Sequence, residues 1–161
     1  MSKSSGIEKI TLFKSPEESP GFLLWHVSLS WRGCIEEILK PLDLTHPQFV
    51  VLATTAWLTK NGNHISQIDI GKTAGLDPNT TSQILRGLEA KSFIQRTRSL
   101  NERSKNPVLT SLGSKVLHKA LPAVENADAK FFELLSSKSI ADLVKIFQKI
   151  TSKNSSIKMA P

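Results

Sequence analysis

The stretch "GLDPNTTSQILRGLEAKSFIQR", residues 75–96, passes from a turn into a predicted helix and then into a predicted strand. Gly75 is typical of a residue that ends a helix, and Asp77 followed by Pro78 is typical of an N-cap with proline in the first turn. The preceding segment "SQIDIGKTA", residues 66–74, fits a short helix that ends at this glycine. The pattern predicts two helices joined by a tight turn.

The second of these helices has two faces of different chemistry. At about 100° per residue, its apolar stripe holds Thr81, Ile84, Leu85 and Leu88, whereas Asn79, Gln83, Arg86 and Ala90 point the opposite way, with Thr80 and Ser82 on the flanks. A slim polar face suits the DNA major groove, because Asn and Gln can pair with adenine, Arg with guanine, and Ser or Thr with phosphates. The alternative is an ordinary solvated amphipathic helix.

A basic hairpin is predicted directly after this helix, in "SFIQRTRSLNERSKNPVLT", residues 92–110. One strand runs from Phe93 to Arg98, a polar tip follows, and a second strand returns over 107–110. Residues 91–105 hold one acid, Glu102, and five basic residues, namely Lys91, Arg96, Arg98, Arg103 and Lys105. This order is the winged-helix arrangement, in which the hairpin tip reaches phosphates or the minor groove. A merely solvated charged loop would leave the polar helix face unexplained.

Long helical patterns flank this lobe. The first is a stripe between Pro20 and Pro41 that consists of Leu24, Ser28, Trp31, Ile35, Ile38 and Leu42. A second helix is expected from Pro47 to about Lys60, followed by a short strand around His64 and Ile65. The C-terminal third carries a stripe of Leu117, Ala120, Val124, Ala127, Phe131 and Leu134, with a kink or break at Pro122, and a last helix with Ile140, Leu143, Val144, Phe147 and Ile150.

The lobe is too short to cover all these apolar positions, which favours a dimer formed through the two ends over a monomer. The predicted fold class is therefore mainly α with a small β-wing (α+β), a winged helix-turn-helix lobe flanked by N- and C-terminal dimerisation helices. The predicted divisions are a flexible arm over 1–18, a dimerisation helix over 19–42, the DNA-binding lobe over 43–112, C-terminal dimerisation helices over 113–151 and a flexible tail over 152–161.

Composition narrows the class of protein. The chain has 161 residues, 39% of them hydrophobic, and a formal net charge of +7, which favours a polyanionic partner such as nucleic acid. One cysteine excludes an internal disulfide and a Cys-based zinc site, and no segment resembles a signal peptide or a membrane span. The four histidines lack metal-ligand spacing, and phosphate loops and nucleophile elbows are absent. We expect a cytoplasmic protein that is no enzyme, with no cofactor, metal or membrane partner.

The chain resembles the MarR-type transcriptional regulators over about residues 42–132. The resemblance lies in "LTHPQFVVL", residues 44–52, in the stretch 75–96, and in "NERSKNPVLTSLG", residues 101–113, which is similar to that family's wing signature. It implies a homodimer whose two lobes read a palindromic site in double-stranded DNA, usually as a repressor released by a small-molecule effector or by oxidation. By position, it implies recognition-helix contacts from Asn79, Thr80, Ser82, Gln83 and Arg86, backbone contacts from Ser66 and Gln67, and a wing-tip contact from Arg103. Lys105 joins this set through its place in the basic wing.

Three positions depart from the family's pattern. Asn101 replaces the acid of the wing signature, Gln83 replaces a residue that is often basic, and Gly87 weakens its helix by around 1 kcal/mol relative to Ala. The alternative function is a winged-helix protein-interaction module without DNA binding, but the basic wing and the slim polar face favour a DNA-binding regulator.

Two further features have competing interpretations. Some relatives sense peroxides through a cysteine near the start of the first helix, whereas Cys34 lies only seven residues before Pro41, so a small semi-buried residue is favoured over a redox sensor. Trp25, Trp31 and Trp57 could line a ligand cavity, but aromatic residues at helical spacing are more often core.

Overall fold

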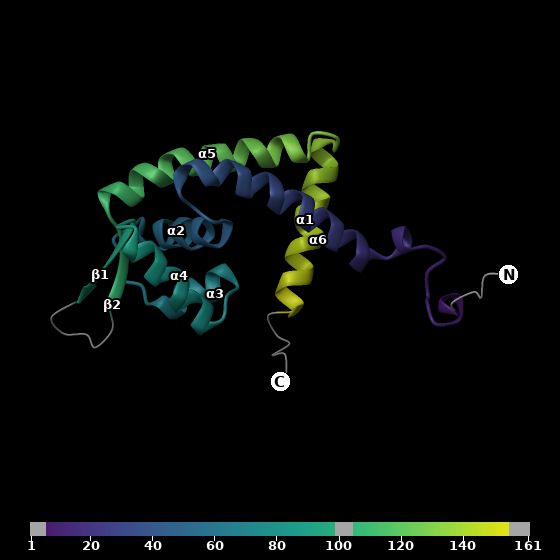
Figure 1. The fold of residues 1–161 in the computed structure, drawn as a ribbon, viewed down its shortest axis with the longest axis horizontal. Helices are drawn as coiled ribbons and strands as arrows, with labels where there is room; N and C mark the ends of the chain where they lie inside the picture. The colour runs from purple at the N-terminus through teal and green to yellow at the C-terminus, as the bar shows by residue number, and fades with distance from the viewer. Residues whose placement is uncertain (1–5, 99–104, 155–161) are drawn as a thin grey trace. The chain divides into compact units, whose positions relative to one another are not determined.

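The computed structural model describes residues 6–98 and 105–154 and confirms the predicted fold class. The described residues are mainly helical and contain a single sheet of two antiparallel strands (Figure 1). The chain divides into two compact units, residues 1–124 and 125–161.

The first long helix, α1 (Pro20–Leu39), is covered along only part of its length. Two short 3₁₀ turns, η1 (Ile7–Lys9) and η2 (Pro16–Glu18), precede it, and Ser19 caps its start by accepting a hydrogen bond from the Phe22 amide. Ile35 and Leu39, near its end, are fully buried. Its N-terminal half exposes four consecutive apolar residues, Phe22, Leu23, Leu24 and Trp25. Of the predicted stripe, Ile35 is fully buried whereas Leu24 is 57% exposed, so the stripe joins the core toward the C-terminal end of α1 and is exposed at the N-terminal end.

Three helices form the centre of the first unit, namely α2 (His46–Thr59), α3 (Gln67–Ala74) and α4 (Pro78–Ala90). Helix α2 packs against both α3 and α4, and these two helices pack against each other (Figure 1). The core between them is apolar because each helix turns one stripe inward. Its fully or nearly fully buried side chains include Val51, Leu52, Ile70, Leu85 and Leu88.

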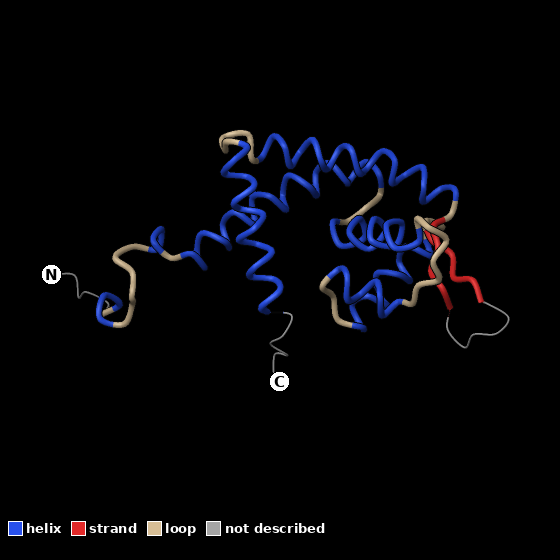
Figure 2. The backbone as a smooth tube through the Cα atoms, turned by 180° about the vertical axis from the view of Figure 1, so that it is seen from behind, coloured by secondary structure: helices blue, strands red, loops and turns tan. Residues whose placement is uncertain are grey.

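The predicted hairpin is confirmed, and the strand predicted before α3 is wrong. Strands β1 (Ile94–Arg98) and β2 (Lys105–Leu109) pair antiparallel, with Ile94 opposite Leu109, and stand out in red in Figure 2. Residues 63–66 adopt no strand. Ile65 buries its side chain there without a ladder partner, and Ser66 already serves as the cap of α3.

The hairpin is joined tightly to α5 (Ser111–Phe131). The Thr110 hydroxyl donates to the Ser92 carbonyl oxygen at 2.6 Å and accepts from the Gly113 amide at 2.9 Å. A Cβ atom added to Gly113 would overlap the Phe93 carbonyl oxygen, so only glycine fits at this contact. Helix α5 continues without a break through Pro122.

The second unit contains α6 (Ser137–Asn154), which extends past the predicted boundary at residue 151. Its apolar positions fall at helical spacing along one face, which we call the α6 face and define by Ile140, Val144, Phe147 and Ile150. These side chains are between 38% and 52% exposed. Among the described residues, no helix is long and apolar enough to cross a membrane.

Candidate nucleic-acid interface

Asp77 fixes the start of α4. Its carboxylate accepts hydrogen bonds from the amides of Asn79 and Thr80, both at 2.9 Å, and from the Thr80 hydroxyl. These bonds favour the charged form, and the bond from the Thr80 hydroxyl contributes most to lowering the pKa of Asp77 below its ordinary value. The carboxylate therefore remains negative at the positive end of the helix dipole, where it stabilises the first turn.

A close approach of two backbones sets how α3 and α4 cross. Gly75 ends α3 with a φ of 70°, a left-handed conformation that glycine adopts easily. A Cβ atom on Gly71 would lie 2.7 Å from Thr81 Oγ1, so the absence of a side chain lets α4 pack directly on α3. Thr81 is itself buried, and its hydroxyl donates to the Asp77 carbonyl oxygen at 2.8 Å.

Helix α4 has the two faces that its sequence predicts. Leu85 and Leu88 are fully buried, whereas Asn79, Gln83 and Arg86 are exposed. None of these three polar side chains has a hydrogen-bond partner among the described residues. Their amide and guanidinium groups are therefore available to an outside partner, and they are the groups that can make paired hydrogen bonds to base edges.

The other predicted contacts on these two helices are engaged or partly covered. The Ser66 hydroxyl donates to Asp69 Oδ2 at 2.7 Å and accepts from the Asp69 amide, and this capping box lowers the pKa of Asp69, chiefly through its bond from the Ser66 amide. Thr80 likewise donates its hydroxyl hydrogen to Asp77. Gln67 and Ser82 are half-buried. Ser66 thus caps α3, and Thr80 supports the Asp77 cap of α4, whatever they contact outside.

The wing is described at its base. Arg103 lies outside the described residues, and Lys105 begins β2 with a side chain that is not described. Arg96 is largely buried, and its Nε lies 3.3 Å from Glu89 Oε2 on α4. This ion pair lacks hydrogen-bond alignment, and both Nε and Nη2 of Arg96 are without a hydrogen-bond partner among the described residues. Arg96 therefore connects the base of the wing to α4 through its ion pair with Glu89.

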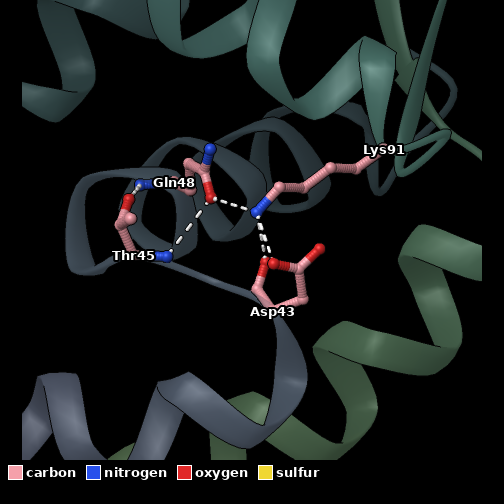
Figure 3. A network of polar contacts seen from close by, with 4 residues as sticks. All are labelled: Asp43, Thr45, Gln48 and Lys91. Atoms are coloured by element: carbon pink, nitrogen blue, oxygen red, sulfur yellow. Dashed lines mark hydrogen bonds and ion pairs between the residues drawn. The ribbon is translucent and has the colours of Figure 1, made fainter.

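Lys91 has a different environment from the one its sequence position suggests. Instead of extending the basic wing, its ammonium is held between Asp43 and Gln48, which belong to the turn before α2 and to its first turn (Figure 3). Sequence reasoning missed this arrangement, since the partners lie 43 and 48 residues away and no local pattern indicates them.

Two interpretations of single residues are corrected. Cys34 is exposed on α1, so it is not a semi-buried residue within the chain. Trp25 and Trp57 are 59% and 66% exposed and therefore are not core residues, and Lys60 Nζ lies 3.4 Å from the Trp57 ring centroid. Trp31 is half-buried and packs edge-on against His46. Within the described ranges, no group of three or more His, Cys, Asp or Glu side chains could hold a metal ion.

Comparisons with known proteins agree with this geometry. The MarR family model matches residues 44–105. The uncharacterized HTH-type transcriptional regulator YdcH of Bacillus subtilis is 37% identical over 123 residues, which cover 74% of this chain and 82% of that protein. The Mycobacterium tuberculosis MarR family protein Rv2887, in complex with salicylic acid, is 27% identical with a TM-score of 0.62, covering 82% of this chain and 96% of the other. A MepR–DNA complex from S. aureus shares the fold, with 24% identity, a TM-score of 0.76, and coverage of 86% and 99%.

Proposed function

Because the chain belongs to the MarR family of transcriptional regulators, we propose that it is a sequence-specific regulator that binds double-stranded DNA in the cytoplasm. The observation that carries this proposal is the exposed, unpartnered polar face of α4, formed by Asn79, Gln83 and Arg86. The helix is held by its buried opposite face, so this polar face can enter the major groove without disturbing the core.

The proposed binding combines two kinds of contact. Asn79, Gln83 and Arg86 read base edges, while the wing supplies positive charge toward the phosphates through Arg103 and Lys105. The flanking residues Ser66, Gln67, Thr80 and Ser82 lie nearer the sugar-phosphate backbone. A formal net charge of +7 supports this division, since phosphate contacts dominate affinity and base contacts determine sequence preference.

We propose that two copies of the chain form the active species. Both α1 and α6 expose apolar side chains, which a solvated monomer rarely leaves in large patches. A two-fold dimer built from these surfaces presents two copies of α4, and such a dimer reads a palindrome whose half-sites lie about one helical turn apart. The dimer acts as a repressor, in line with Rv2887, which is named a transcriptional repressor.

A small molecule is proposed to release the dimer from DNA. The support is the related Rv2887, whose structure was determined with salicylic acid. We therefore expect an aromatic carboxylate to be a suitable first probe of this chain. Addition of salicylate to the preformed complex is expected to lower the bound fraction in a concentration-dependent way, and benzyl alcohol serves as an uncharged control.

The proposal is tested by selecting bound fragments from the genome of the source organism. Purified protein is mixed with sheared genomic DNA, and the retained fragments are sequenced and then used in gel shifts against random duplexes of equal length. We expect one or a few enriched fragments with a palindromic core and a specific dissociation constant of about 10⁻⁸ M or tighter at physiological salt. Equal retention of all fragments would contradict sequence-specific binding. No retention would favour the protein-interaction module instead.

A further inference from the structure

The C-terminal end of α4 is held by polar contacts that the proposed reading of DNA does not use (Figure 3). Lys91 Nζ donates to the Asp43 carbonyl oxygen at 2.6 Å, to Asp43 Oδ1 at 2.9 Å and to Gln48 Oε1 at 3.1 Å. An ammonium group has three donors, so each of its hydrogen atoms has an acceptor here. We call this arrangement the Lys91 clasp and define it by Asp43, Gln48 and Lys91.

Gly87 makes room for the same clasp. It lies one helical turn before Lys91, on the same side of α4. A Cβ atom at Gly87 would lie 3.2 Å from Gln48 Nε2, which is shorter than most contacts that Cβ atoms make in proteins. Gln48 is itself fixed, because its side-chain Oε1 accepts from the Thr45 backbone N–H at 3.2 Å and its backbone N–H donates to Thr45 Oγ1 at 3.3 Å. The last turn of α4 therefore rests on the capping box that starts α2.

The clasp connects α4 to the end of α1. The 3₁₀ turn η3 (Lys40–Leu42) continues directly from α1, and Asp43 ends it in a left-handed conformation with a φ of 53°. Lys91 therefore binds the backbone at the point where the chain leaves α1 and turns toward α2. Lys91 therefore links α1, which is proposed to pair the subunits, to α4, which is proposed to read DNA.

We propose that Lys91 is a positioning residue, which holds α4 at the angle to the α1–α2 turn at which the polar face of α4 fits its DNA sequence. This inference rests on the proposed function. The Asp43 side chain is 76% exposed, so charge attraction alone contributes little. The bonds to the Asp43 carbonyl and to Gln48 supply direction, and the Lys91 side chain is only 26% exposed.

The test compares Lys91→Met with Lys9→Met. Both variants lose one positive charge, but Lys9 is an exposed residue of η1, and methionine at position 91 retains an apolar stem without donors. We measure affinity for a genome-selected fragment and for a random duplex at one salt concentration. Lys91→Met is expected to lower the ratio of the two affinities by about tenfold, a typical coupling between linked sites, and Lys9→Met is expected to leave it unchanged.

A second variant covers the case in which Lys91→Met fails to fold. Asp43→Asn removes the charge but retains both the carbonyl oxygen and a residue type that tolerates the left-handed conformation. We expect a smaller loss of the same ratio at an unchanged melting temperature. In the double variant, the loss is expected to equal that of Lys91→Met alone, because the Asp43 carboxylate acts through Lys91.

Three outcomes would overturn the proposal or separate it from the proposed function. Equal weakening on both duplexes would make Lys91 a phosphate contact, and an unchanged ratio in Lys91→Met and Asp43→Asn would exclude a positioning role. If the wild-type chain itself does not discriminate, the proposed function fails. In that case, amide hydrogen exchange over residues 86–92 tests whether Lys91 holds the end of α4. Exchange is expected to accelerate in Lys91→Met and not in Lys9→Met.

Discussion

Helices α4 and α6 carry similar apolar stripes, but the described residues cover them very differently. On α4, Leu85 and Leu88 are fully buried, whereas Phe147 and Ile150 on the α6 face are 43% and 52% exposed. The periodicity of a sequence therefore indicates which face of a helix avoids water, but not which surface covers it. For α4 the cover is α2 and α3 of the same chain, and for α6 we propose a second copy.

The largest expected effect comes from breaking the covered stripe. Leu85→Ala removes buried methyl groups and leaves a cavity, so the free energy of unfolding should fall by about 2 to 5 kcal/mol. Leu112→Ala is the matched control, because Leu112 is 49% exposed, and it should cost less than half as much. Urea denaturation followed by circular dichroism measures both. Similar losses in the two variants would contradict the assignment of Leu85 to the core.

The next effect concerns the uncovered stripe. Phe147→Glu places a charge on the α6 face and should weaken dimerisation by about 2 kcal/mol or more, the range of an interface hot spot. In a light-scattering dilution series, the fall toward the 17.8 kDa mass of one chain should then occur at a protein concentration about 30-fold or more above that of the wild type. Lys149→Glu adds the same acid on the opposite side of α6 and should leave the dimer intact. A wild-type mass near 17.8 kDa would remove the basis of the proposed second copy.

The polar face of α4 offers a smaller and more selective effect. Gln83 is exposed and points away from Leu85, so Gln83→Ala should leave the fold unchanged. A good bidentate base contact is worth about 1 to 3 kcal/mol of discrimination, and we expect a loss of that size on the selected site and almost none on random DNA. Paired titrations at one salt concentration measure this difference. Equal losses on both duplexes would move Gln83 to the DNA backbone.

The smallest effect distinguishes the caps of the two helices. The Asp77 carboxylate caps α4, whereas the neutral Ser136 hydroxyl accepts from the Ser139 amide at the start of α6. The pKa of Asp77 is lowered in the folded chain, so its stabilisation is complete above the unfolded pKa of about 3.9 and is lost as pH falls through the folded value. Melting temperatures of wild type and Asp77→Asn should differ at pH 7, and the difference should begin to shrink near pH 4 and disappear only below the folded pKa of Asp77. A constant difference across this range would exclude a charged cap.

Local signals account for the parts of the fold that the sequence predicts correctly. The pair Asp77 and Pro78 marks the start of α4 and Gly75 marks the end of α3, because capping depends on residues within one turn. The strand predicted around His64 and Ile65 is wrong because a strand needs a hydrogen-bonded partner strand, and the residues near it in the sequence do not show whether one is available.

The candidate site shows the same division. The exposure of Asn79, Gln83 and Arg86 follows from helical periodicity. The roles of Gly87 and Lys91 depend instead on Gln48, which approaches them only after α2 and α4 have packed. From its neighbours in the sequence alone, Gly87 is a residue that weakens a helix, and Lys91 is one more basic residue of the wing. In the folded chain, one provides space and the other provides three hydrogen bonds.

The contact between Gly71 and Thr81 has a consequence for how this sequence can change over evolution. A Cβ atom at position 71 would meet Thr81 Oγ1 at 2.7 Å and the Leu76 carbonyl oxygen at 3.2 Å. Gly71→Ala should therefore be harmful in the present background and better tolerated once Thr81→Ala has removed the hydroxyl. The two substitutions are therefore expected to show epistasis, and the order in which they arise matters. Thr81 on α4 must lose its hydroxyl before position 71 on α3 can gain a methyl group.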